Sequence, residues 1–394
     1  YYHAKIADLF METYSGVPYT NYTSYDYQRM WERRNDVTEH PDRPWVVTEM
    51  RNGRLEYVYL ANFDWYNYMY DDSRPTQDYN VSVRGGSKNV SYMVSGRYYH
   101  QDGIFRIGPD DFDSFNTRAK VDVQICPWLK LTSNTRFFHS KYHYAGNEYR
   151  RPTLHALASF VPVNPDGTFV SHTTLTQSAA HYIMDGYSAM LHKGVQFGTQ
   201  KITELTSSWI LAADITDNLK FNVDFSYKFG YQRSPYRDAT VQYSQYPGEI
   251  ATESTNYIDR YSDTINERND YVANAFISYA DTWNEDHDFT GTVGVNYEAR
   301  NYNDVSVRRQ DMLTEELSDF NLAFGNVDKL TGGVKEYALA GLFYRFTYAW
   351  KSRYLFETNG RLDGSSRFPK GNQWGFFPSV SAAWRLSEEP WMAN

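Results

Sequence analysis

Apolar and polar side chains alternate strictly over residues 219–231. The odd positions are all apolar or aromatic: Leu219, Phe221, Val223, Phe225, Tyr227, Phe229 and Tyr231. The even positions between them carry Lys, Asn, Asp, Ser or Gly. Successive side chains of a strand point to opposite faces, so the pattern predicts a strand with one apolar and one polar face. At about 3.3 Å per residue it spans about 43 Å, enough to cross a bilayer at a tilt.

The same period of two recurs along most of the chain. Similar apolar faces occur within 115–125, 271–279, 289–297 and 376–386. From these patterns we expect strands near 77–86, 89–100, 113–126, 129–141, 201–215, 219–232, 266–281, 287–302, 334–349, 353–364 and 373–387. Alternation repeated this often predicts an all-β chain.

The connections between these strands are alternately short and long. Tight turns near residues 87, 127, 217, 284 and 351 alternate with loops at 101–112, 142–200, 233–265, 303–333 and 365–372. This alternation is typical of outer-membrane barrels, whereas a soluble sandwich has no reason to sort its loops by length. A propeller would show a repeated blade signature, and none is evident. The sequence therefore predicts an antiparallel transmembrane β-barrel with long extracellular loops.

Tryptophan in the tight turns supports a membrane rim. Trp128, Trp283 and Trp350 fall in three of these turns. Aromatic rings are favoured at a membrane surface because their bodies are apolar and their edges can bind headgroups. The alternative is that these residues simply fill the turns.

Composition narrows the function classes. The 394 residues include 36 Tyr, 23 Phe and 10 Trp, and the net charge is −9. A chain this acidic is unsuited to nucleic acid, which requires clustered positive charge. The single cysteine, Cys126, excludes an internal disulfide and a multi-cysteine metal site. The mean hydropathy of −0.67 still fits a barrel, in which only every second strand residue faces lipid.

Signatures of catalysis or metal binding are weak. The sequence has no G-x-S-x-G elbow, phosphate-binding loop or H-E-x-x-H motif. His139 and His143 could share one strand face near His155, and three aspartates lie within 110–113. We interpret both groups as solvated side chains. We expect no enzyme activity, no cofactor and no bound metal.

Ligand contacts are expected in the outer loops and on the polar strand faces. The loop tyrosines could stack on sugar rings or pack against peptide: Tyr142, Tyr144, Tyr149, Tyr182 and Tyr187. The alternative is that these rings only order a long loop. Arg97 and Arg361 lie on polar strand faces and are candidates for the lumen of a barrel.

Two regions resemble the SusC/RagA family of TonB-dependent transporters. Residues 79–87 (YNVSVRGGS) and 99–104 (YHQDGI) resemble its first full hairpin. Residues 361–368 (RLDGSSRF) and 375–379 (GFFPS), followed by 383–385 (AWR), resemble its most recognisable barrel signature. The resemblance runs from about residue 62 to 392. We interpret the following motif residues as a structural element that begins a loop: Asp363, Gly364, Ser365, Ser366, Arg367 and Phe368.

The resemblance implies an architecture. The family barrel has 22 strands, so residues 77–394 would supply about 11 of them, from the second strand to the twelfth. Residues 1–76 would be the first extracellular loop region, with a short helix around 25–33. We expect the chain to be a fragment that lacks the plug domain and the second half of the barrel.

The resemblance also implies a function. It implies import of oligosaccharides or peptides across the outer membrane of a Gram-negative, Bacteroidetes-like cell. The expected partners are a SusD-like lipoprotein, the TonB–ExbB–ExbD complex acting through the absent N-terminal part, and outer-membrane lipid. The alternatives are a TonB-dependent siderophore or cobalamin receptor, and a soluble all-β carbohydrate-binding module.

Overall fold

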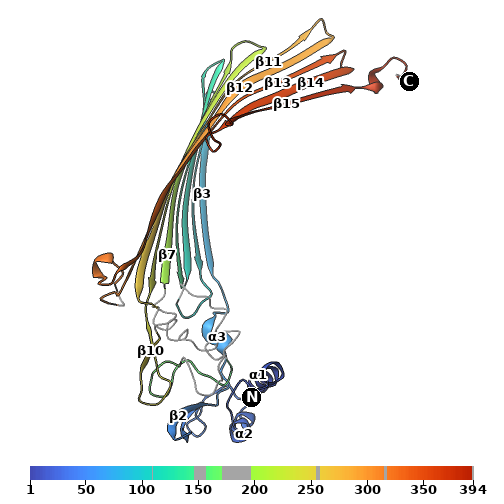
Figure 1. Ribbon diagram of the computed structural model, residues 1–394. Coiled ribbons are helices and arrows are strands. Elements are labelled where there is room, and N and C mark those ends of the chain that lie inside the picture. The colour runs from blue at the N-terminus through green and yellow to red at the C-terminus, as the bar shows by residue number, and fades with distance from the viewer. Residues whose placement is uncertain (109, 146–156, 171–196, 254–257, 315–316, 393–394) are drawn as a thin grey trace.

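Eleven strands form one antiparallel sheet. The computed structural model describes residues 1–108, 110–145, 157–170, 197–253, 258–314 and 317–392. The sheet follows chain order from edge to edge, and Figure 1 shows it as a long curved wall. Its strands are β3 (Thr76–Gly86), β4 (Val90–Asp102), β5 (Asp111–Cys126), β6 (Leu129–Ala145), β7 (Phe197–Asp214), β8 (Leu219–Asp238), β11 (Arg260–Trp283), β12 (His287–Gln310), β13 (Val327–Trp350), β14 (Tyr354–Ser365) and β15 (Trp374–Trp384). The predicted all-β antiparallel architecture is confirmed.

Short turns gather at one end of the sheet and long connections at the other. The turns at 87–89, 127–128, 215–218, 284–286 and 351–353 alternate with connections of 8 residues or more. In the last of these turns Lys351 and Ser352 have φ angles of 53° and 52°. Positive φ at both central residues matches the twist of antiparallel strands and closes a tight turn.

The two faces of the sheet differ in chemistry. Phe225 lies opposite Ala273 on one side and Trp209 on the other. The next residue, Asp224, lies opposite Asn274. We call the face that carries Phe225 the apolar face and the face that carries Asp224 the polar face. Phe225 is 43% exposed and Trp209 is 47% exposed, so no second protein layer covers the apolar face here.

Strands β11, β12 and β13 are longer than the alternation predicts, with 24 residues each. The extra length lies at the end away from the short turns. There the apolar face carries Asp263, Glu267 and Asn301, so the apolar–polar alternation is lost. Backbone pairing continues regardless, because ladder hydrogen bonds do not depend on side-chain polarity.

The first 70 residues lie outside the main sheet and form what we call the cap. It comprises α1 (Tyr2–Ser15), α2 (Ser24–Glu32), β1 (Val46–Arg51), β2 (Arg54–Tyr59) and α3 (Trp65–Met69). Thr23 and Asp26 form a capping box at the start of α2, which begins and ends one residue before the short helix predicted at 25–33. Asn52 and Gly53, with φ of 50° and 80°, close the β1–β2 hairpin. The cap lies at the end of the sheet away from the short turns (Figure 1).

The core of the cap draws on a distant part of the chain. Residues from α2, β2 and α3 bury their apolar side chains with Leu157, Phe160, Val161 and Val170, which come from the connection between β6 and β7. Tyr22 donates its hydroxyl hydrogen to the carbonyl of Tyr59 at 2.7 Å. Nowhere in the described ranges does a helix combine the length and the apolar character needed to traverse a membrane.

Smaller elements complete the fold. Strands β9 (Val241–Tyr243) and β10 (Ala251–Glu253) pair in the connection after β8. One short 3₁₀ helix, Phe320–Leu322, lies between β12 and β13, and Phe320 packs on Tyr261 with ring centroids 4.7 Å apart. A second, Leu386–Glu388, follows β15.

Candidate ligand-binding face

A row of hydrogen-bonded polar side chains crosses the middle of the polar face. Asn274 on β11 donates from Nδ2 to Oδ1 of Asp224 on β8 at 2.7 Å. Asn296 on β12 donates from Nδ2 to Oδ1 of Asn274 at 2.6 Å. The three residues lie directly opposite one another in the strand register. The row therefore offers amide and carboxylate groups, and no cationic group, to a polar ligand.

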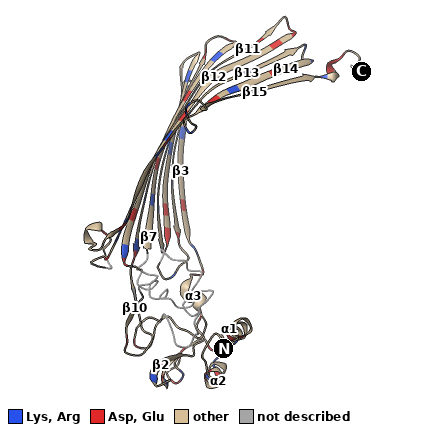
Figure 2. Cartoon of the chain, viewed as in Figure 1, with Lys and Arg blue, Asp and Glu red and all other residues tan. Residues whose placement is uncertain are grey.

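Charged residues on the polar face mostly neutralise one another. Asp270 pairs with Arg268 at 2.5 Å and with Arg300 at 2.6 Å. Lys228 pairs with Glu204 at 2.8 Å. Figure 2 shows both signs interspersed along the strands. Ligand recognition on this face would therefore depend on hydrogen bonding and stacking more than on net charge.

An aromatic row runs across the polar face near the cap end of the sheet. The ring centroids of neighbours are 6.1, 6.5, 5.4 and 6.4 Å apart along the series Tyr99, Phe112, Tyr142, Tyr144 and Tyr236. Gly198 makes this possible, because a Cβ there would lie 2.3 Å from the Tyr144 ring. Flat rings in series can stack on sugars or pack against peptide.

The sequence interpretation placed Tyr142 and Tyr144 in a loop, but both lie in strand β6. The strand continues to Ala145 because its backbone pairs with β5 on one side and with β7 on the other. The partners Tyr99, Phe112 and Tyr236 were missed. The sequence could have indicated them, because each falls at an alternating position that belongs to the polar face, near the end of its strand. The candidates Tyr149, Tyr182 and Tyr187 lie outside the described residues.

The two candidate arginines both point from the polar face and both are paired. Arg97 on β4 makes two hydrogen bonds to Asp78 on β3, from Nε at 2.8 Å and from Nη2 at 2.7 Å. Arg361 on β14 pairs with Asp363 at 2.9 Å. The structure does not bring the arginines together, because they lie on strands near opposite edges of the sheet.

The family motif at 363–368 ties the end of β14 to β13. The Ser366 amide donates to the carbonyl of Ala338, and the Ala338 amide donates to Oγ of Ser366 at 2.8 Å. The Arg367 guanidinium lies 4.0 Å from the centre of the Tyr337 ring. A Cβ on Gly364 would lie 2.8 Å from the Trp374 indole, so only glycine fits there. These contacts favour a structural role for the motif.

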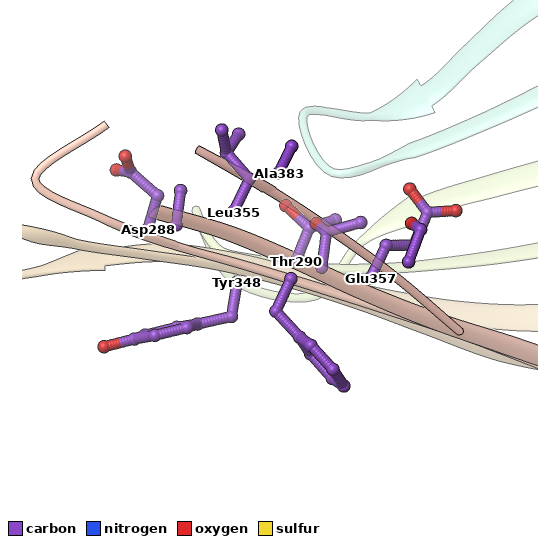
Figure 3. Close-up of a pocket in the computed structure, with 10 residues that line it drawn as sticks. Asp288, Thr290, Tyr348, Leu355, Glu357 and Ala383 are labelled. Carbon is purple, nitrogen blue, oxygen red and sulfur yellow. The ribbon is translucent and has the colours of Figure 1, made fainter. Parts of the chain in front are cut away.

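Two hollows open on the polar face. One of about 410 Å³ is lined by Arg361, Asp363, Asn296, Phe377 and the exposed ring of Phe368. Another of about 290 Å³ lies near the short turns (Figure 3). In Figure 3 the side chains of Asp288, Thr290 and Glu357 lie on one side of the sheet and Tyr348 lies on the other. Both hollows are open to solvent, and apolar atoms make up more of their lining than polar atoms do.

The two described histidines of the group His139, His143 and His155, which the sequence interpretation took as solvated, contact neighbouring side chains. His139 Nδ1 lies 3.0 Å from Oγ1 of Thr203, and His143 Nδ1 lies 2.8 Å from Oδ1 of Asp111. His155 lies outside the described residues. Within the described ranges, no three His, Cys, Asp or Glu side chains are grouped as a metal site.

Sequence comparison finds curated relatives among TonB-dependent receptors. No protein-family model matches the chain. It is 25% identical over 356 residues to the TonB-dependent receptor SusC of Bacteroides thetaiotaomicron, covering 85% of this chain and 33% of SusC. It is 24% identical over 347 residues to TonB-dependent receptor P3 of Formosa agariphila, covering 85% of this chain and 32% of that protein. The chain thus spans about a third of the length of these relatives.

Structure comparison gives the same fold. The RagAB peptide importer in its open-open state superposes with a TM-score of 0.69 at 17% identity, covering 96% of this chain and 41% of that one. The RagAB peptide transporter superposes with a TM-score of 0.65 at 18% identity, covering 83% of this chain and 36% of that one. In sequence the chain is therefore similar to TonB-dependent receptors such as SusC, and its fold is similar to that of the RagAB importer.

Proposed function

We propose that the chain forms part of an outer-membrane importer of oligosaccharides or peptides. The observation that carries the proposal is the pairing of a water-exposed apolar face with a polar face on one continuous sheet. Lipid would cover the apolar face, and the polar face would line the lumen, as in transmembrane barrels. The short turns would then lie in the periplasm, and the cap would lie outside the cell with the long connections.

The aromatic row is the best candidate for ligand contact. It lies on the lumen side, near the cap, where a ligand would enter. RagAB, whose fold the chain shares, is described as a peptide importer, and the relative SusC is named a TonB-dependent receptor. Uptake would depend on TonB–ExbB–ExbD for energy and on a SusD-like lipoprotein at the extracellular mouth.

The alternatives fit the structure less well. A siderophore or cobalamin receptor shares the barrel, but the 361–368 signature and the fold similarity to the RagAB peptide importer favour the importer. A soluble carbohydrate-binding module would leave Phe225, Trp209 and the rest of the apolar face in water. An exposed apolar surface of that size is not stable in a soluble monomer.

Uptake by the full-length receptor tests the proposal. Cells that express it would be given fluorescent oligosaccharides, fluorescent peptides or a ferric chelate, with and without a functional TonB protein. We expect TonB-dependent uptake of an oligosaccharide or a peptide, reduced by the double substitution Tyr142→Ala and Tyr144→Ala. Tyr66→Ala, an exposed cap residue, is the matched control. Uptake of the ferric chelate alone would favour the siderophore receptor, and a protein soluble without detergent would contradict a barrel.

A further inference from the structure

Three cationic side chains form one row across the apolar face. Lys141 on β6 lies directly opposite Lys201 on β7, and Lys201 lies directly opposite Arg233 on β8. Paired strands are about 4.8 Å apart, so the three positions fall within about 10 Å. All three have the parity of Phe225 rather than that of Asp224. The row therefore stands on the surface that the proposed function assigns to lipid.

The row lies at the upper limit of the apolar band. Four residues nearer the short turns on each strand, the same face carries Phe137, Leu205 and Phe229. Lys141 lies 12 residues beyond Leu129, where β6 begins. That distance is about 40 Å along the strand and about 30 Å along the membrane normal at the usual tilt, just beyond an apolar band of about 25 Å. The cations therefore lie at the level of lipid headgroups.

Neighbouring acidic side chains neutralise the positive charge of the row only in part. Like charges directly opposite each other destabilise a sheet. Arg233 pairs with Asp263 at 2.7 Å, and its side chain remains 48% exposed. Asp113 lies opposite Lys141 and offsets part of its charge, while its Oδ1 also accepts hydrogen bonds from Tyr98 and His100. Lys201 is exposed and has no ion-pair partner within the described ranges. The arrangement leaves room for an external anion.

We propose that Lys141, Lys201 and Arg233 form a site for the phosphate of an outer-leaflet lipid headgroup. The inference rests on the proposed membrane placement of the sheet. A phosphate can bridge several cations with charge-assisted hydrogen bonds, which relieves their mutual repulsion. A lipid is favoured over free phosphate because its acyl chains would lie on Phe137, Leu205 and Phe229 directly below. Bound in this way, the lipid would fix the depth of the barrel at β6 to β8.

Native mass spectrometry of the full-length receptor in detergent tests the site. The probes are phosphatidic acid, which carries a phosphate monoester, and phosphatidylcholine with the same acyl chains. We expect a preference for phosphatidic acid on the order of ten-fold, which the triple substitution Lys141→Gln, Lys201→Gln and Arg233→Gln abolishes. An unchanged preference in this triple variant would overturn the proposal.

Matched controls separate the site from general charge effects. The triple substitution Arg84→Gln, Lys120→Gln and Arg136→Gln removes the same charge from the polar face and should keep the preference. The pair Lys141→Arg and Lys201→Arg preserves the charges and should keep it too. An equal loss in the polar-face triple, or complete displacement of the lipid by excess inorganic phosphate, would contradict a headgroup site. A receptor that stays dispersed without detergent would overturn the membrane placement itself, whereas a failure of ligand uptake alone would affect only the proposed transport.

Discussion

The indole Nε1 of Trp65 donates a hydrogen bond to the carbonyl of Leu157 at 3.1 Å, although the residues lie 92 positions apart. Trp65 is 5% exposed and packs against Phe63 and Tyr68. Leu157 itself is buried in the same core. The contact therefore joins the start of the chain to the connection between β6 and β7, and the cap depends on both.

Trp65→Ala should loosen the cap while leaving the sheet intact. Removing a buried indole costs about 3–5 kcal/mol through lost burial and the cavity left behind. Trp65→Phe keeps most of the ring and should cost about 1 kcal/mol, the value of the hydrogen bond. Hydrogen exchange on the full-length receptor would measure the loss of protection in 1–70. The same protection loss in Tyr66→Ala, which alters an exposed ring, would argue against this core.

The cap should also be destabilised by acid. Burial opposes ionisation of Asp26, but hydrogen bonds from Arg51, Thr23 and Arg29 outweigh it and hold the pKa of Asp26 below its ordinary value. Because the folded pKa lies below the unfolded one, this stabilisation is complete above the unfolded pKa of about 4 and is lost as the pH falls through the folded value. Protection of the cap should therefore hold from neutral pH to about pH 5 and decline below about pH 4.

Asp26→Asn tests that explanation. Arg51 and Arg29 would lose a buried anionic partner, which costs about 3–5 kcal/mol at neutral pH. The remaining protection of the cap should then vary less with pH between about 5 and 3, measured by hydrogen exchange. Asp42→Asn, at an exposed position, is the control. A variant with the full acid response of the natural protein would show that another group is responsible.

Arginine on the two faces of β8 should have unequal effects. Phe225→Arg places a cation on the apolar face near the middle of the strand and should cost about 2–4 kcal/mol in a bilayer. Asn222→Arg places it on the polar face and should cost much less. Refolding titrations of the full-length receptor in lipid vesicles would compare them. Equal losses would contradict the assignment of the faces.

Cysteine labelling on intact cells should distinguish the two ends of the sheet. Leu313, in the connection between β12 and β13, is 63% exposed, and Asp217 is exposed in the turn between β7 and β8. A membrane-impermeant maleimide should label Leu313→Cys on whole cells and Asp217→Cys only after the outer membrane is opened. Cys126, the one natural cysteine of the chain, serves as the reference. The reverse labelling pattern would invert the proposed topology.

The sheet could be predicted because its information is local. In β8 a strict period of two runs from Leu219 to Tyr231, so the strand and both its faces follow from sequence alone. The ends of β11 to β13 that lie away from the short turns could not be predicted from the sequence, because residues such as Asp263 and Glu267 make both faces polar there. Pairing with neighbouring strands, which the sequence does not reveal, determines where those strands end.

The cap and the aromatic row required contacts between distant segments. Trp65 and Leu157 form one core, yet nothing in either local sequence indicates the other. Tyr142 and Tyr144 were recognised as candidates by residue type, but their rings gain partners only when β4, β5 and β8 place Tyr99, Phe112 and Tyr236 beside them. The candidates could therefore be chosen from the sequence, but their assembly into a row could not.

Strand β13 is longer than β14, so part of the β13 backbone extends beyond its pairing with β14; we call this part the free margin. β13 has 24 residues and β14 has 12, and the two meet at a short turn. Pairing with β14 ends at Leu339. Among the residues that the structure describes, the Val327 end of β13 therefore has unpaired amides and carbonyls on that side, apart from the contact of Ala338 with Ser366. Such a margin can template an added strand, and charged or glycine residues discourage it. Lys329, Gly332, Gly333 and Lys335 occupy this stretch, and we infer that they guard the receptor against unwanted strand addition at its mouth.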